Sequence, residues 1–169
     1  MPTLDELFFL EPGQPVSNGT IASNPFSEDD ALVEAQILEI RYDGIRSVLG
    51  VTLEMRLAER ITETSTALLV AHNVIHYSWN QTDRRGGRTA WTIISSSPLR
   101  TETGFGLELK TSPSGALSIT ANSASLYSVR ISELEGTAPP DYGDRNYAAI
   151  RRGIANWTSD VEVVGVSHS

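Results

Sequence analysis

The fold is decided by residues 46–58, which read RSVLGVTLEMRLA. Hydrophobic side chains occupy every second position from Leu49 to Leu57, and glycine, threonine, glutamate and arginine stand between them. This alternation is typical of a β-strand with one buried and one solvated face. The stretch follows Asp43 and Gly44, a pair typical of two-residue hairpin turns because glycine tolerates a positive φ. We therefore predict a β-hairpin at the centre of the fold.

The chain on either side of this hairpin predicts further strands by the same alternation. Residues 31–42 fit a helix as well as a strand, but the hairpin turn that follows them favours a strand. The links between the predicted strands are short, which favours antiparallel pairing. The predicted strands other than the central one are 31–42, 66–79, 89–96, 103–110, 116–121, 125–131 and 161–164.

These elements predict a mainly β fold, in which about seven or eight strands form a single-domain antiparallel β-sandwich or partly open barrel. A short C-terminal helix is expected, with Asp141 or Asp144 as its N-terminal cap and Gly153 as its end. We divide the chain into an acidic, partly ordered N-terminal arm over residues 1–30 and one β-rich domain over residues 31–169.

The composition is that of an acidic globular protein. The chain has 169 residues, a formal net charge of −8 and no cysteine, so disulfides and thiolate metal sites are excluded. The negative charge disfavours binding to nucleic acid or to an anionic membrane. The acidic start of the chain does not resemble a secretion signal, and no apolar run is long enough for a membrane span. We therefore expect a soluble, cytoplasmic protein.

Two loops carry the residues most typical of a binding surface. The first is an arginine-rich turn between two tryptophans, and the second is a rigid Pro-Pro-Asp-Tyr-Gly segment near the C-terminus. Arginine and tryptophan are favoured anchors of interfaces, and arginine grips carboxylates and phosphates. The alternative is a solvated turn whose tryptophans pack into the core, with the tyrosine holding the helix on the sheet. The candidate binding residues are Trp79, Arg84, Arg85, Arg88, Trp91 and Tyr142.

The sequence offers no catalytic or metal-binding signature. His72 and His76 have the spacing of zinc ligands on a helix, but a strand separates them by about 13 Å, too far for one ion. No Gly-x-Ser-x-Gly elbow is present, and residues 104–106 (GFG) lack the third glycine and the helix of a phosphate-binding loop. We therefore assign no catalytic residue, no metal ligand and no cofactor.

These observations favour a non-enzymatic protein that acts by binding another macromolecule, and its acidity favours a basic protein partner. A second interpretation is a small-ligand-binding barrel or sandwich, with Tyr42, Tyr77, Trp79 and Trp91 around its mouth. A third is a hydrolase or isomerase whose site would combine one of the histidines with an acid and a serine. An uncovered sheet edge would also allow a homo-oligomer.

Overall fold

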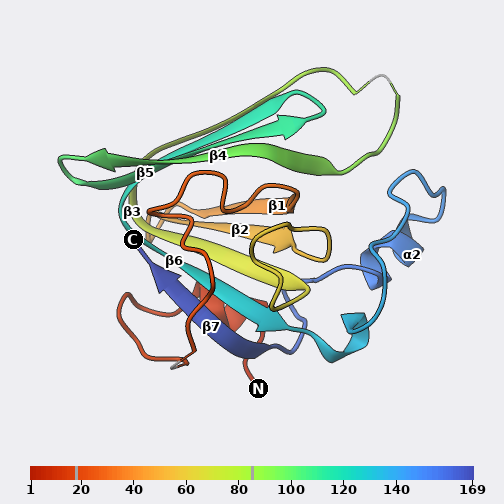
Figure 1. The fold of residues 1–169 in the computed structure, drawn as a ribbon, viewed down its shortest axis with the longest axis horizontal. Helices are drawn as coiled ribbons and strands as arrows, with labels where there is room; N and C mark the ends of the chain where they lie inside the picture. Colours follow the sequence, from red (N-terminus) through yellow and green to blue (C-terminus); the bar gives the residue numbers. More distant parts are fainter. Residues whose placement is uncertain (18, 85) are drawn as a thin grey trace.

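The fold is one antiparallel sheet, seen in a computed structural model that describes residues 1–17, 19–84 and 86–169 (Figure 1). The helical elements in these ranges are α1 (Leu4–Phe8), a single 3-10 turn (Ser132–Leu134) and α2 (Tyr147–Arg152). The prediction of a mainly β, antiparallel fold with a short C-terminal helix is confirmed. The strands in the described ranges are β1 (Gln36–Asp43), β2 (Val48–Glu54), β3 (Thr66–Gln81), β4 (Trp91–Thr101), β5 (Gly104–Ser112), β6 (Gly115–Arg130) and β7 (Glu162–His168).

The sheet curls into a ring that is not a barrel. Its strand order is β3-β2-β1-β4-β5-β6-β7, and a further pairing of β3 with β6 joins the two sides. β3 and β6 each contain 16 residues and bend between the two layers seen in Figure 1. β1 and β4 pair only through Gln36 with Thr92 and Ile37 with Trp91. The ring is therefore held by a very short ladder on the β1–β4 side.

Several strand boundaries differ from the sequence prediction: β4 and β7, for example, continue to Thr101 and His168, and two differences are larger. β1 begins at Gln36, because residues 31–34 form turns, so only the second half of residues 31–42 is a strand. The strands predicted at 116–121 and 125–131 are one continuous strand, β6. Its two halves pair with β5 and β7 in succession, and a partner change along one strand leaves no interruption in the sequence pattern.

The N-terminal cap of α2 is Asn146, so the prediction of Asp141 or Asp144 was wrong. The Asn146 side chain accepts a hydrogen bond from the N–H of Ala149 at 3.2 Å. The two aspartates instead accept hydrogen bonds within the turns that precede the helix, Asp141 from the N–H of Gly143 and Asp144 from that of Asn146. Aspartate serves both turns and caps, so the sequence alone did not separate these roles.

Two hydrophobic clusters lie on the opposite faces of β2 and β3. The larger one fills the inside of the ring with aliphatic side chains such as Leu53, Leu69 and Leu117. The smaller one covers the outer face, where Leu68 and other sheet residues meet α1 and the segment after α2. The central strands are therefore buried on both faces.

The helix α1 attaches to this outer face through Phe8. Thr3 and Glu6 form the capping box that starts the helix. The Phe8 ring lies on the backbone of β2 at Gly50, where an added Cβ would come within 2.7 Å of the ring. A glycine is needed at this position because a real Cβ would push the helix off the sheet.

The central strand β2 corrects the prediction of one buried and one solvated face. All its residues are buried, and Thr52 and Glu54, predicted to face solvent, are each only 1% exposed. The strand ends at Glu54, and the chain then turns, so Leu57 is 53% exposed instead of continuing the buried series. The polar side chains between the hydrophobic ones therefore do not mark a solvated face, and Glu54 belongs to a buried ion pair.

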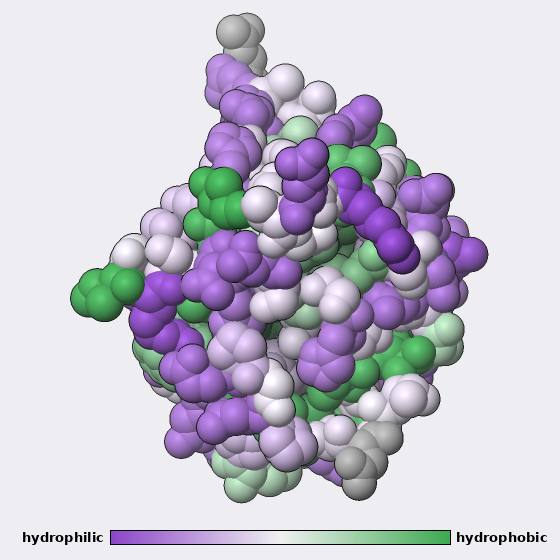
Figure 2. All heavy atoms as spheres, turned by 90° about the vertical axis from the view of Figure 1, so that its left-hand side faces the viewer, coloured by the Kyte–Doolittle hydropathy of each residue, from purple (hydrophilic) through white to green (hydrophobic). Residues whose placement is uncertain are grey.

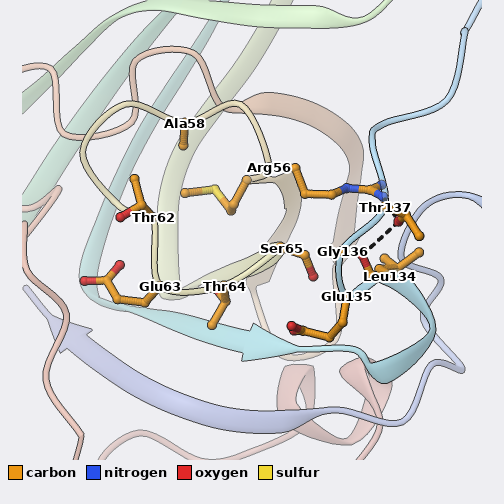
Figure 3. A pocket seen from close by; sticks show the side chains of 11 residues that line it. Arg56, Ala58, Thr62, Glu63, Thr64, Ser65, Leu134, Glu135, Gly136 and Thr137 are labelled. Atoms are coloured by element: carbon orange, nitrogen blue, oxygen red, sulfur yellow. Dashed lines mark hydrogen bonds between the residues drawn. The ribbon is translucent and has the colours of Figure 1, made fainter.

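That ion pair joins Glu54 to Arg56. The carboxylate accepts two hydrogen bonds from the guanidinium, at 2.8 Å from Nε and 2.7 Å from Nη2, and both side chains are buried. The remaining Arg56 N–H groups donate to Thr137 Oγ1 and to the carbonyls of Ala138 and Gly153. Figure 3 shows the Arg56 side chain ending beside Thr137. One side chain thus ties both ends of the segment 137–153, which carries α2, to the central strand.

Truncation of two leucines of the alternating pattern, one inside β2 and one beyond its end, tests where the strand stops. Leu53→Ala should lower the free energy of unfolding by about 2–5 kcal/mol, because Leu53 is fully buried and a cavity remains. Leu57→Ala should change it by no more than about 0.5 kcal/mol, because this side chain is half exposed. Urea unfolding of both variants measures the difference, and equal losses would contradict the end of β2 at Glu54.

Removal of Arg56 should be strongly destabilising. Arg56→Met leaves the Glu54 carboxylate buried without its partner, which we expect to cost about 3–5 kcal/mol. The double variant Glu54→Leu/Arg56→Met should recover most of this loss, because no uncompensated charge remains. Lys110→Met, which breaks the exposed pair with Glu108, is the control and should cost no more than about 1 kcal/mol. Chemical denaturation measures all three, and an equally mild Arg56→Met would contradict the buried pair.

Candidate functional site

The strongest candidate site lies where β1 and β4 separate, on the side of the ring that faces α2 (Figure 1). A cavity of about 230 Å³ lies here between β1, the loop before β4 and α2. We call it the arginine cleft. It is lined by Ile37, Leu38, Arg84, Arg88, Thr89, Ala90, Trp91, Tyr142, Tyr147, Ile150, Arg151 and Ile154.

Trp79 on β3 and Trp91 on β4 flank the arginine-rich turn, which we call the arginine loop, and they pack against each other. The rings of Trp79 and Trp91 meet edge to face with centroids 5.3 Å apart, and both lie against the core inside the ring. The indole N–H of Trp79 donates to Gln81 Oε1 at 2.7 Å. Trp91 lines the arginine cleft, whereas Trp79 stands behind it. Trp79 therefore supports Trp91 and does not itself form the wall.

Arg84 lies over the face of Trp91. Its Cζ is 4.1 Å from the ring centroid, a distance typical of a cation–π contact. Its Nε is buried and has no hydrogen-bond partner among the described residues. Burial lowers the pKa of Arg84 from its ordinary value, although an arginine remains charged at neutral pH. The cleft thus contains a partly desolvated cation with an unused donor.

Arg88 links the loop to the C-terminal segment. Its Nη2 donates to the carbonyl of Asp144 at 2.7 Å, and its Cζ lies 5.3 Å from the centroid of the Tyr147 ring. These two contacts hold the guanidinium at the rim of the cleft. Arg85, the third arginine that the sequence singled out in this loop, lies outside the described residues.

Arg151 brings a third guanidinium to the cleft from α2. Its Nη1 lies 3.5 Å from Glu39 Oε1 on β1, and its Nη2 donates to Asn156 Oδ1. Glu39 Oε2 is buried and has no hydrogen-bond partner among the described residues. Arg151 is therefore held between β1 and the end of α2, with part of its charge balanced by Glu39.

Tyr142 forms the wall opposite the loop. Its hydroxyl donates to Gln36 Oε1 at 2.9 Å, which joins the C-terminal segment to the first residue of β1. Burial, together with the nearby Glu54 carboxylate, raises the pKa of Tyr142 to about 12, although Arg56 opposes the shift. The hydroxyl is therefore a neutral donor and not a base. Glu54 and Arg56, the two charges that act on this pKa, form the buried ion pair.

The charge of the arginine cleft is opposite to that of the whole chain. The described residues that line it include three arginines and no acid, whereas the chain carries a net charge of −8. Aromatic and aliphatic residues together with Thr89 supply the rest of the described lining, and burial partly desolvates the guanidinium of Arg84. Such a site can hold a carboxylate or phosphate through charge-assisted hydrogen bonds.

The sequence prediction located about half of this arrangement. The structure brings Tyr142 to one cavity with Arg84, Arg88 and Trp91, which lie more than fifty residues earlier in the chain. The prediction missed Arg151, Tyr147 and the isoleucines of the α2 region. A usable signal existed, because Tyr147 and Arg151 are four residues apart in a helix and therefore share one face.

The histidines lie elsewhere. His72 and His76 are both on strand β3, as predicted, and His72 is buried in a hollow that also contains Glu11 and Arg46. Burial lowers the pKa of His72, and Arg46 lowers it further, so its neutral form is favoured. Within the described ranges, no group of three or more histidine, aspartate or glutamate side chains could hold a metal ion.

Neither the comparisons with known proteins nor the rest of the surface indicates a function. Comparisons with protein-family models, curated proteins and solved structures found no match. Neither short helix in the described part of the chain is long and apolar enough to cross a membrane. The face seen in Figure 2, at the end of the molecule remote from α2, carries hydrophobic residues only in separate small patches.

Tyr142→Phe should change how stability depends on pH. The folded state holds the Tyr142 proton up to about pH 12, whereas the unfolded chain loses it near pH 10. This contribution is complete below pH 10 and is lost as the pH rises to 12. The variant should lose about 1 kcal/mol at neutral pH with its hydrogen bond to Gln36, and its stability should fall less steeply above pH 10.

Urea unfolding across the alkaline range measures this difference. Burial also raises the pKa of Tyr127, so the variant should keep a residual alkaline slope from that residue. Identical slopes for the variant and the unaltered protein would contradict the buried position of the Tyr142 hydroxyl.

Proposed function

We propose that this protein is a non-enzymatic binding protein that holds an anionic group of a macromolecular partner in the arginine cleft. The observation that carries the proposal is the convergence of Arg84, Arg88 and Arg151 on one aromatic-walled cavity in an otherwise acidic chain. Like charges gathered in this way repel one another, and an anion relieves the repulsion. A carboxylate suits the site because it accepts paired hydrogen bonds from a guanidinium.

The aromatic wall supports this role by fixing the arginines before the ligand arrives. Arg84 rests on Trp91, and Arg88 is bonded to the Asp144 carbonyl beside Tyr147. A side chain that is already ordered loses less conformational entropy on binding, which raises affinity. Exclusion of water by the rings also strengthens the attraction between a guanidinium and an anion.

The shape of the surface favours a segment of a larger partner over a small ligand. Next to the arginine cleft lies a second hollow of about 440 Å³, and the two share Arg88, Thr89, Ala90 and Tyr142 as walls. This second hollow reaches as far as the exposed side chain of Leu57. The result is an elongated depression with charged and apolar parts, which suits an extended chain.

The prediction of a basic partner comes from the net charge and concerns the surface as a whole. A basic partner can still carry the anionic group that the arginine cleft binds. The acidic surface attracts the basic protein, and the arginine cleft selects an acidic segment on it. The small-ligand interpretation rests on the modest volume of the cleft, whereas the aromatic residues first assigned to it, Tyr42 with Tyr77 and Trp79 with Trp91, pack in pairs.

Substitution of one arginine tests the proposal. A labelled glutamate-rich peptide should bind the protein in low salt, and Arg84→Gln should weaken that binding by about tenfold or more. Arg84 is the informative position because its Nε has no partner in the described structure. Fluorescence anisotropy measures the affinity, and added salt should reduce it because the attraction is partly screened.

Arg100→Gln is the matched control. It removes the same charge from an exposed residue near the far end of β4, outside the arginine cleft. The control should bind the acidic peptide as the unaltered protein does. Equal effects of the two substitutions, or no binding of the peptide at any salt concentration, would refute the proposal.

A further inference from the structure

Strand β1 has one edge that is free over most of its length. Its other edge pairs with β2 as far as Asp43 with Val48, but its pairing with β4 stops at Ile37 with Trp91. Residues 38–43 make backbone hydrogen bonds only to β2 within the described part of the chain. This unpaired edge begins at Leu38, which is also a wall of the arginine cleft.

The opposite wall also carries unused backbone groups. Thr89 and Ala90 precede β4 and belong to no helix, turn or strand. Their N–H and C=O groups have no hydrogen-bond partner in the described ranges, and Thr89 is exposed to solvent. The arginine cleft thus separates two stretches of chain that both have free donors and acceptors.

An added strand would satisfy both of these features. Strand addition supplies the backbone hydrogen bonds that an edge lacks, and alternate side chains of the added strand enter the neighbouring pockets. The pocket at the start of this edge presents Arg84, Arg88 and Arg151, so acidic side chains at alternate positions complement it. Free inorganic anions or small carboxylates would meet the arginines but leave the β1 edge unpaired.

We propose that an extended acidic segment of a partner protein adds as a strand to the free edge of β1 at residues 38–43, with its carboxylates toward the three arginines of the cleft. This inference rests on the proposed function and adds the conformation of the ligand to it. The acidic surface around the arginine cleft repels segments that are acidic along their whole length. A segment with a short acidic stretch and basic flanks would suit both.

A pair of synthetic peptides tests strand addition without altering the protein. The first is a short peptide of alternating glutamate and valine, and the second has the same sequence with alternate backbone amides N-methylated. The charges are identical, but the second peptide lacks the donors that pair with an edge. We expect the first to bind, and the second to bind at least about tenfold more weakly.

Amide hydrogen exchange followed by NMR locates the contact. Amides within residues 38–43 should exchange more slowly in the presence of the first peptide, while those of residues 104–109 in β5, remote from the cleft, should be unchanged. A lysine–valine peptide of the same length should protect neither segment. If the free protein already protects residues 38–43 in a concentration-dependent way, the edge is occupied by a second copy and the proposal is wrong.

The outcomes separate this inference from the proposed function. Equal affinities of the two acidic peptides, with no added protection of β1 but with weaker binding to Arg84→Gln, would overturn strand addition and leave anion binding in place. If neither of these peptides binds, and the glutamate-rich peptide does not bind at any salt concentration, both proposals are wrong. Circular dichroism of the Arg84→Gln variant confirms that its fold is intact before these comparisons are made.

Discussion

The buried pair of Glu54 and Arg56 is the interaction on which the rest of the structure depends. Both charges are removed from water, which costs several kcal/mol unless every donor is satisfied. The guanidinium meets this condition by bonding to Glu54, Thr137, Ala138 and Gly153. The same bonds fix the two ends of the segment that holds Tyr142, Tyr147 and Arg151. The C-terminal wall of the arginine cleft is therefore positioned from the core of the sheet outward.

The incomplete closure of the ring supplies the other half of the site. β1 and β4 share two residue pairs and then diverge, and the space between them is bounded by the arginine loop, by Tyr142 and by α2. A longer β1–β4 ladder would have sealed the edge of β1 and displaced the cavity. The positive cleft in an acidic chain thus follows from where the sheet stops pairing.

Much of the fold was predictable because it depends on local patterns. The alternation after Asp43–Gly44 located the β1–β2 hairpin, but the predicted two-residue turn was wrong, because the connection spans residues 44–47 and the positive φ falls on Ser47 instead of Gly44. The two-sided burial of β2 was not predictable, because a glutamate in a strand normally faces solvent and its partner Arg56 lies beyond the strand end. The site was half predictable. The Trp-Arg loop and Tyr142 stood out by composition, but their meeting with Arg151 depends on contacts between residues more than a hundred positions apart, such as Tyr142 with Gln36.

The central claim is that Arg56 anchors the segment 137–153 and so builds the wall of the arginine cleft. Residue-resolved hydrogen exchange of the Glu54→Leu/Arg56→Met variant tests it most directly, because that variant keeps the core filled without the anchor. The account predicts that amides of α2 and its flanking loops exchange markedly faster than in the unaltered protein, while those at the centre of β3 and β6 remain protected. Unchanged protection across residues 137–153 would contradict it.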